Sequence, residues 1–357
     1  MQIRRVLGIV MLMMAPILTL IACGNSAAPS GVSTTQAPVA TQALVPTQAP
    51  AAAQTTVRVG YVPVLVYAPL YVGIERGYFK DEGITIESLP IQGGSEAVVQ
   101  LAAGNFDAAL GGAGAGLFNA AARGVSFAIV APMHSERPPV SSPLVISAKR
   151  VNEIKSIADL KGKKVSINAT GAATEYWLAQ ALAKGGLTMN DIQLTTVPFP
   201  QVPAALESGA LDAGILGEPL ATINQQQGLV AILSNDFIDG FYATYLYMGD
   251  SLLKQKPELA AGFMRAYLRA CRDMQGNYMT PEIAQIVEKY TKVPAAVVEK
   301  AALPQYNADG TIPIDNLETL QTYFRERKLL EYANALDIKS LVNTKIGEDA
   351  AKALGKP

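Results

Sequence analysis

The sequence predicts an α/β protein built from two lobes that lie side by side. Its 357 residues are enough for two domains of ordinary size. Short runs of strand type alternate with helical runs, which is typical of sheets whose strands run parallel. The same order of strand, helix, strand, helix and strand occurs twice, about 105 residues apart. This repeat predicts two α/β lobes; the alternative is a chance similarity of common Gly-Asp-Ala turns.

The N-terminus has the order of an export signal. Two arginines precede an apolar run from Val6 to Leu20, and the stretch Leu20-Ile21-Ala22-Cys23 follows. A run of about 15 residues is short for a bilayer-spanning helix of about 20 residues, which disfavours a transmembrane helix. The stretch that ends in Cys23 resembles the lipobox of bacterial lipoproteins. This resemblance implies that residues 1–22 are a signal peptide and that Cys23 carries the lipid anchor, in which palmitate is one of the acyl chains.

Residues 23–55 have the composition of a tether. After Cys23 the segment contains no charged or aromatic residue, and Thr-Gln-Ala units begin at Thr35, Thr41 and Thr47. Such a segment cannot bury enough apolar surface to offset the entropy of the chain. We therefore expect an extended, disordered link between the lipid and the folded body.

Residues 56–145 form the first predicted lobe. The first strand alternates polar and apolar residues, and each helix ends at a glycine. The predicted strands are Val57–Tyr61, Ile84–Leu89, Phe106–Gly111 and Phe127–Val130, and the predicted helices are Pro69–Gly77 and Ser95–Gly104.

Residues 146–237 form the second predicted lobe, which repeats the first. The clearest match aligns Leu101–Ala108 with Leu206–Ala213. The predicted strands are Lys164–Ile167, Ile192–Val197 and Leu211–Leu216, and the predicted helices are Thr174–Lys184 and Val202–Ser208.

Residues 238–357 are predicted to return to the first lobe and to be mostly helical beyond Phe241. Each expected helix starts near a proline or a polar cap. These helices are Pro257–Met274, Pro281–Tyr290, Pro294–Ala302 and Ile314–Lys328.

Composition excludes several classes of function. The formal net charge at pH 7 is −1, which gives no reason to expect a nucleic-acid partner. Besides Cys23 the chain has one cysteine, Cys271, on the apolar face of a predicted helix, and one histidine, His134. We therefore expect no internal disulfide, no metal site and no cofactor. No nucleophile–base pair, glycine-rich phosphate loop or paired acid site occurs, so we do not expect an enzyme.

Several motifs between Val57 and Val342 resemble one family. They are Gly60-Tyr61-Val62-Pro63, Ala68-Pro69-Leu70-Tyr71-Val72-Gly73, Glu75-Arg76-Gly77-Tyr78-Phe79 and Gly93-Gly94-Ser95. Together with the lipobox they resemble the binding lipoproteins of ABC importers for pyrimidine precursors, alkanesulfonates, nitrate and riboflavin. The resemblance implies a type II periplasmic-binding-protein fold with a ligand cleft between the lobes. It also implies a lipid-anchored monomer on the extracytoplasmic face of the cell membrane, with a permease and its ATPase as partners.

The loops that follow the predicted strands are the candidate cleft, and they contain no Lys or Arg. An anionic ligand is usually bound by such cations or by several backbone N–H groups that point at it, so a sulfonate or nitrate is disfavoured. His134 and Arg137 are the nearest exceptions. The loops and nearby segments supply carboxylates, small polar residues and aromatic rings for a neutral planar heterocycle. The candidate ligand-binding residues are Tyr61, Tyr67, Tyr71, Gly94, Ser95, Glu96, Gly112, Asn168, Thr170, Gly171, Thr174, Glu175, Tyr176, Trp177, Glu218 and Tyr242.

The resemblance favours riboflavin as the ligand, because riboflavin is uncharged, has a large ring and carries a polyol. An aminopyrimidine precursor of thiamine is the first alternative. A sensor subunit and an enzyme of pyrimidine synthesis are the other classes; the enzyme is disfavoured because its cysteine-rich motif is absent. Trp177 is expected either to stack on the ligand or to pack between helix and sheet. Glu218 is expected either to contact the ligand or to cap the next helix.

Overall fold

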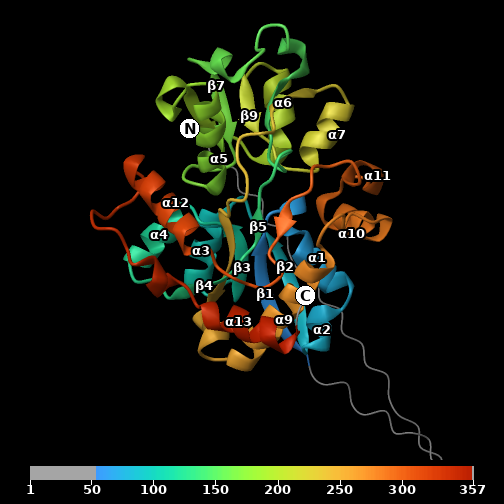
Figure 1. Cartoon of the computed structure of the whole chain (residues 1–357), viewed down its shortest axis with the longest axis vertical. Helices are drawn as coiled ribbons and strands as arrows, with labels where there is room; N and C mark the ends of the chain where they lie inside the picture. The colour runs from blue at the N-terminus through green and yellow to red at the C-terminus, as the bar shows by residue number, and fades with distance from the viewer. Residues whose placement is uncertain (1–53, 356–357) are drawn as a thin grey trace, which may run out of the picture. The chain divides into compact units, whose positions relative to one another are not determined.

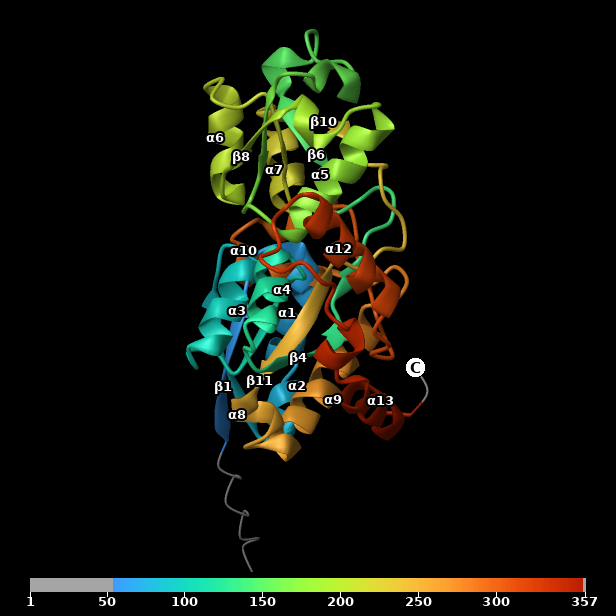
Figure 2. The ribbon, with the colours of Figure 1, turned by 90° about the vertical axis from the view of Figure 1, so that its left-hand side faces the viewer.

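The computed structural model describes residues 54–355, which form two lobes one above the other in Figures 1 and 2. The predicted signal peptide, Cys23 and almost all of the predicted tether lie outside the described residues. The first strand begins at Thr55, so the folded body starts at the last residue predicted for the tether. None of the helices within residues 54–355 combines the length and the apolar character that a membrane span requires.

Lobe 1 is built on a five-stranded sheet in the order β2-β1-β3-β11-β4. β1 runs parallel to β2 and β3, as predicted, whereas β11 is antiparallel to both β3 and β4. The sheet is therefore mixed and not parallel throughout, because one strand arrives from the other lobe. The strands are β1 (Thr55–Tyr61), β2 (Ile84–Pro90), β3 (Ala108–Gly112), β4 (Phe127–Pro132) and β11 (Thr244–Gly249), and the helices are α1 (Ala68–Glu75), α2 (Tyr78–Asp81), α3 (Gly94–Ala102) and α4 (Ala115–Ala122).

Lobe 2 repeats this plan in a second five-stranded sheet, in the order β10-β6-β9-β7-β8. Here β7 runs parallel to β8 and β9, and β6 is antiparallel to β9 and β10. The strands are β6 (Leu144–Ser147), β7 (Lys164–Ile167), β8 (Gln193–Thr196), β9 (Ala213–Ile215) and β10 (Val230–Ser234), and the helices are α5 (Ala173–Lys184), α6 (Val202–Glu207) and α7 (Leu220–Gln226).

Two segments cross between the lobes. The first leaves β4, forms the short strand β5 (His134–Ser135) and reaches β6, and the second leads from β10 back to β11. β11 then lies in the interior of the lobe 1 sheet, with all six residues buried. This strand is missing from the sequence prediction. A strand buried on both faces has no polar–apolar alternation to reveal it, so its apolar run does not distinguish a strand from a helix.

The C-terminal part packs around lobe 1 (Figure 2). The long helix α9 (Pro257–Asp273) contacts α1, α2 and α13, and it buries Cys271 completely, as its apolar face predicts. The helix predicted for Pro294–Ala302 is much shorter than expected, because α11 ends at Val298. The other elements are α8 (Asp250–Leu253), α10 (Pro281–Thr291), α11 (Ala295–Val298), β12 (Gln305–Tyr306), α12 (Ile314–Glu326) and α13 (Thr344–Ala353). Short 3-10 turns lie at Leu65–Tyr67, Ala148–Arg150, Ile157–Leu160, Met189–Asp191, Phe199–Gln201 and Ile338–Leu341.

Candidate ligand-binding site

A cavity lies between the lobes, at the carboxyl ends of β1 and β3 in lobe 1 and of β7 and β9 in lobe 2. Its empty space is about 550 Å³, and this volume includes the open solvent at the mouth of the cavity. This is the place where open α/β sheets bind ligands, because the loops that follow parallel strands meet there. Its lining comprises Val62, Val64, Val66, Tyr67, Gly93, Gly112, His134, Ser142, Asn168, Ala172, Ala173, Thr174, Trp177, Phe199, Gly217, Glu218 and Thr244.

Much of the wall is apolar. Lobe 1 contributes three valines and Tyr67 from the loop after β1, and lobe 2 contributes Trp177 from the first turns of α5 and Phe199 after β8. The Trp177 side chain is 2% exposed. Among the described residues that line the cavity, none is Lys or Arg. The cavity therefore offers aromatic surface to a flat ring and no fixed cation to an anion.

One polar group of the lining is Glu218, which is nearly buried. Its carboxyl accepts the Thr222 N–H at 3.0 Å and the Thr222 hydroxyl at 2.9 Å. Burial raises the pKa of Glu218, although these hydrogen bonds oppose the shift. Glu218 therefore holds the first turn of α7 and lines the cavity at the same time.

A second polar group of the lining is His134, at the start of the first crossing segment. Its Nδ1 is 2.7 Å from the Thr244 hydroxyl, and its Nε2 is 3.6 Å from the Glu136 carboxylate. Glu136, also buried, accepts the Ser141 N–H at 2.6 Å and the Ser141 hydroxyl at 2.9 Å. The first crossing segment and the first residue of β11 thus bring a buried polar cluster to the cavity.

The third polar group of the lining is contributed by lobe 2. The Thr174 hydroxyl donates to Asn168 Oδ1 at 2.5 Å, and Asn168 Nδ2 donates to the Gln92 carbonyl of lobe 1 at 2.8 Å. Asn168 therefore both lines the cavity and joins the lobes across its mouth.

The lobes touch at two more points beside the cavity. The Ala115 N–H donates to the Gly171 carbonyl at 2.8 Å, and the Leu65 N–H donates to the Glu218 carbonyl at 2.8 Å. A Cβ added at Gly114 would lie 2.1 Å from the Gly171 carbonyl oxygen, so only glycine allows this approach. These contacts hold the lobes in a closed arrangement.

Six of the sixteen candidate residues line the cavity, and each lies at the end of a strand or in the segment that follows one. They are Tyr67, Gly112, Asn168, Thr174, Trp177 and Glu218. Gly94 and Ser95 stand at the start of α3, and the surroundings of Gly94 and the side chain of Ser95 lie outside what the structure describes. The part that every candidate plays in binding stays a prediction.

Three lobe 1 candidates lie elsewhere. Tyr61 and Tyr71 pack edge to face, with ring centroids 5.6 Å apart, and Tyr71 also stacks on Tyr290 at 4.3 Å. The Tyr71 hydroxyl donates to the carbonyls of Val62 and Val64, so it fixes the loop that lines the cavity. Glu96 accepts the Gln92 N–H at 2.8 Å.

Thr170, Gly171, Glu175 and Tyr176 lie at or just before the start of α5, outside the lining. Glu175 is fully buried and accepts the Gly171 N–H at 2.9 Å and Arg327 Nε at 3.0 Å. The Tyr176 ring lies 4.8 Å from the Phe241 ring and 5.2 Å from the Tyr323 ring.

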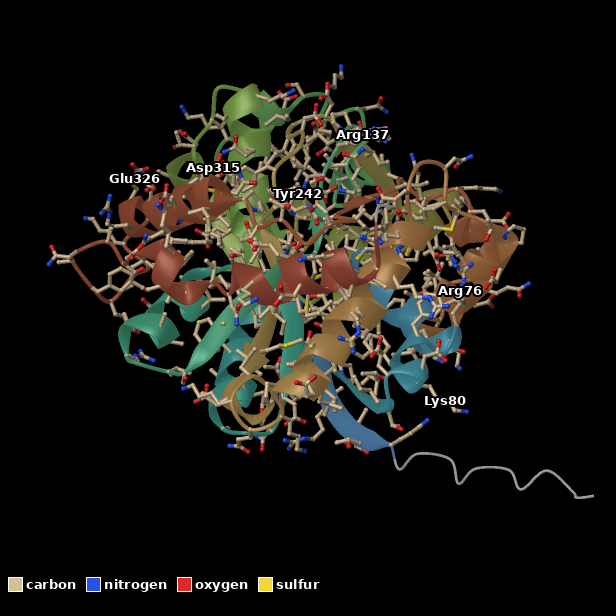
Figure 3. All side chains as sticks on the ribbon, turned by 60° about the horizontal axis from the view of Figure 1, so that its bottom comes forward. Arg76, Lys80, Arg137, Tyr242, Asp315 and Glu326 are labelled. Atoms are coloured by element: carbon tan, nitrogen blue, oxygen red, sulfur yellow. The ribbon has the colours of Figure 1, made fainter. Side chains whose placement is uncertain are left out.

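Tyr242 lines a second, open cavity together with Arg137, and its empty space of about 970 Å³ includes open solvent. Figure 3 shows both side chains near the crossing segments. The other lining residues come from the stretches 274–278 and 303–306.

Sequence reasoning missed several lining residues, among them Val64, Val66, Phe199, Ser142 and Thr244. Phe199 stands in a predicted loop, and only its aromatic ring signalled a role. Thr244 belongs to β11, the strand that the sequence did not reveal. Among the described residues, no group of three or more His, Cys, Asp or Glu side chains is placed to hold a metal ion.

The chain belongs to the NMT1-like family, whose model matches residues 50–288. It is 27% identical over 249 residues to the riboflavin-binding protein RibY of Chloroflexus aurantiacus, covering 68% of this chain and 69% of that protein. It is 25% identical over 301 residues to the nitrate/nitrite binding protein NrtA of a Nostoc species, covering 78% and 68%. Most of the relatives are binding proteins by name, and one is named as a synthase of a pyrimidine phosphate.

The fold is that of the periplasmic binding proteins, as predicted. The alkanesulfonate-binding protein SsuA of Xanthomonas axonopodis, bound to MOPS, superposes with a TM-score of 0.68 at 18% identity, covering 82% of this chain and 100% of that chain. At this level of identity the likeness concerns the fold alone.

Proposed function

We propose that this protein is the extracytoplasmic substrate-binding component of an ABC importer and that it captures a neutral planar heterocycle, riboflavin in the first place. Membership in the NMT1-like family and the two-lobed fold support the binding component. The observation that carries the class of ligand is the cavity lining. It combines aromatic and aliphatic side chains with hydroxyl, amide, imidazole and carboxyl groups, and none of its described residues is Lys or Arg.

The lining supplies groups for both parts of riboflavin. Trp177 and Tyr67 offer rings on which an isoalloxazine stacks, and stacking contributes about 0.5–1.5 kcal/mol beyond buried area. Asn168 and Thr174 offer an amide and a hydroxyl for a polyol. The RibY relative, named as a riboflavin-binding protein, supports the same choice.

An aminopyrimidine precursor of thiamine is the second candidate, because Glu218 lines the cavity and a carboxylate pairs with an amino group. Anions are a further alternative, because some relatives are named for binding nitrate or sulfonates. Anions are disfavoured because they require cations or several aimed donors. An enzyme of pyrimidine synthesis is disfavoured because the cysteine-rich motif of that enzyme is absent from the sequence.

The anchor and the partners belong to the same proposal. Cys23 carries the lipid on the extracytoplasmic face of the cell membrane, and a permease with its ATPase receives the ligand from a monomeric binding protein. Replacing the thiol by Cys23→Ser removes the acceptor of the lipid. Metabolic labelling with a fatty acid should then show an unlabelled, unprocessed precursor, and equal labelling of the variant would contradict the anchor.

The ligand is tested by titrating the purified protein with riboflavin and following flavin fluorescence, which stacking quenches. Trp177→Ala should weaken binding about tenfold, since it removes a stacked and buried ring. Val151→Ala, which truncates an exposed side chain of the same lobe, is the control and should bind like the wild type.

Thermal melting of each variant separates a local loss from unfolding. Unchanged affinity and quenching in a folded Trp177→Ala variant would contradict the stacking role. A loss of about tenfold in wild-type affinity between low and high salt would indicate an anionic ligand instead.

A further inference from the structure

The imidazole of His134 has one nitrogen without a hydrogen bond in the part of the chain that the structure describes. The side chain is 2% exposed and lines the cavity between the lobes. Nδ1 is paired with the Thr244 hydroxyl at 2.7 Å, whereas Nε2 has no partner within hydrogen-bond distance. The nearest acidic oxygen, Oε1 of Glu136, is 3.6 Å away, which is too far for a hydrogen bond. A buried polar atom of this kind calls for a partner.

The surroundings of the ring indicate which nitrogen carries the proton. Glu136 accepts both the N–H and the hydroxyl of Ser141, so its carboxyl faces the ring as an acceptor. A carboxylate oxygen near Nε2 favours the proton on that nitrogen. The Thr244 hydroxyl then donates to Nδ1, and Nε2–H is a donor that the protein itself leaves unused.

Glu218 presents an acceptor to the same cavity. Its carboxyl accepts two hydrogen bonds from Thr222 and a long one of 3.5 Å from the Ala302 N–H. An ionised carboxylate has about four acceptor positions, so one remains. Its backbone N–H donates to the Ser141 carbonyl at 2.8 Å, which connects Glu218 to the residue that also holds Glu136.

We propose that His134 and Glu218 together select a ligand that carries a lactam or imide edge, in which a ring carbonyl stands beside a ring N–H. His134 Nε2–H donates to the carbonyl oxygen, and the Glu218 carboxylate accepts from the ring N–H. This inference rests on the proposed binding function and narrows its ligand class. An aminopyrimidine without a carbonyl leaves Nε2–H unpaired, and an anion meets the carboxylate, so both are rejected at this end of the cavity.

The test titrates the full mature protein with lumichrome, which carries the imide edge without the polyol, and with its N3-methyl derivative, which lacks the ring N–H. The wild type should bind lumichrome at least about tenfold more tightly than the methyl derivative, because the methyl group leaves the fourth acceptor position of Glu218 without a donor. Glu218→Gln should lose most of that preference. His134→Phe keeps a ring of similar size without the donor and should weaken lumichrome about tenfold or more. His134→Gln keeps an amide donor and should recover part of this loss.

The outcomes separate this inference from the proposed ligand. A folded His134→Phe variant that binds lumichrome like the wild type overturns the role of His134 and leaves riboflavin binding intact. Wild-type protein that binds no flavin contradicts riboflavin, and lumazine and uracil, which carry the same edge on smaller rings, then test the inference alone. Failure of all these imides to bind the wild type overturns the inference.

Discussion

The two lobes fold the same unit, and their comparison shows what the repeated motif does. In lobe 1, Asp107 accepts the backbone N–H of Arg58 at 3.0 Å and donates its own N–H to the Arg58 carbonyl at 2.9 Å. In lobe 2, Asp212 does the same with Lys164, at 2.7 Å and 2.9 Å. The aspartates thus connect β1 to β3 in lobe 1 and β7 to β9 in lobe 2. The repeat is a structural device and carries no information about the ligand.

The lobes differ in where they place a glycine at this junction. Paired positions hold Gly60 and Ala109 in β1 and β3 of lobe 1, but Ser166 and Gly214 in β7 and β9 of lobe 2. A Cβ at Gly60 would lie 2.4 Å from the Phe106 ring, and a Cβ at Gly214 would lie 2.3 Å from the Ser166 hydroxyl. In each lobe the glycine therefore leaves space for a larger side chain. In lobe 1 the glycine stands in β1 because it faces the Phe106 ring, and in lobe 2 it stands in β9 because it faces the Ser166 hydroxyl.

The largest loss of stability is expected when a side chain fills the space at Gly60. Gly60→Ala should destabilise the protein by about 2–3 kcal/mol, because the methyl group collides with a buried ring in close-packed surroundings. Urea unfolding measures the change. The matching change in lobe 2, Ser166→Ala, removes a buried hydroxyl that has no hydrogen-bond partner among the described residues, so it should be neutral or stabilising.

A second substitution sharpens this difference between the lobes. Phe106→Leu gives lobe 1 the residue that lobe 2 has at the equivalent position, Leu211. It should reduce the cost of Gly60→Ala when the two changes are combined. Strictly additive costs would show that the Phe106 ring is not what excludes a side chain at Gly60.

A smaller effect is expected from the two aspartates. Asp107→Asn and Asp212→Asn should each cost about 1–2 kcal/mol at pH 7, since each weakens hydrogen bonds between charged groups. Burial raises the pKa of both carboxyl groups, but hydrogen bonds with Arg58 in lobe 1, and with Lys164 and Arg150 in lobe 2, outweigh it, so both pKa values lie below the usual one.

The sign of the pH dependence follows from these lowered values. A carboxyl group whose pKa is lower in the folded state stabilises the protein above the unfolded pKa of about 3.9. That stabilisation is lost as the pH falls through the folded pKa. The gap between wild type and each variant should therefore shrink below about pH 4, as measured by urea unfolding across pH. A gap that stays constant down to pH 2 would contradict a charge-dependent role.

The repeated unit could be predicted from the sequence because its strands and helices have clear periods and its helices end at glycines. The sequence could not predict which way a single side chain points. Tyr61 is the last residue of the first strand, at the end where ligand contacts are expected, yet its ring packs against Tyr71 and against Tyr290, which is far away in the chain. His134 comes near the cavity because a crossing segment passes there, and the paths of both crossing segments depend on β11, the buried strand without alternation.

The smallest expected effect concerns the contact between the lobes. Arg327, just beyond α12, is the cation that Glu175 of α5 contacts, and Glu175 is fully buried. In Arg327→Ala the Glu175 carboxylate loses its cation and keeps only the hydrogen bond from the Gly171 N–H. Opening of the lobes would let water hydrate this carboxylate. The balance between closed and open forms should therefore shift toward the open form by about 1 kcal/mol, roughly a fivefold change. Arg325→Ala, on the exposed face of the same helix, is the control and should change nothing.

Trp177 reports this shift without any ligand. It is the only tryptophan of the chain, it lines the cavity, and it is 2% exposed in the closed arrangement. Opening gives it water on one side, so the Arg327→Ala variant should show red-shifted emission and stronger quenching by acrylamide than the wild type. Equal emission and quenching in both proteins would show that the ion pair between Arg327 and Glu175 does not hold the lobes together. The closed arrangement would then rest on the backbone contacts at Gly171 and Glu218, where Gly114→Ala is the change that separates the lobes.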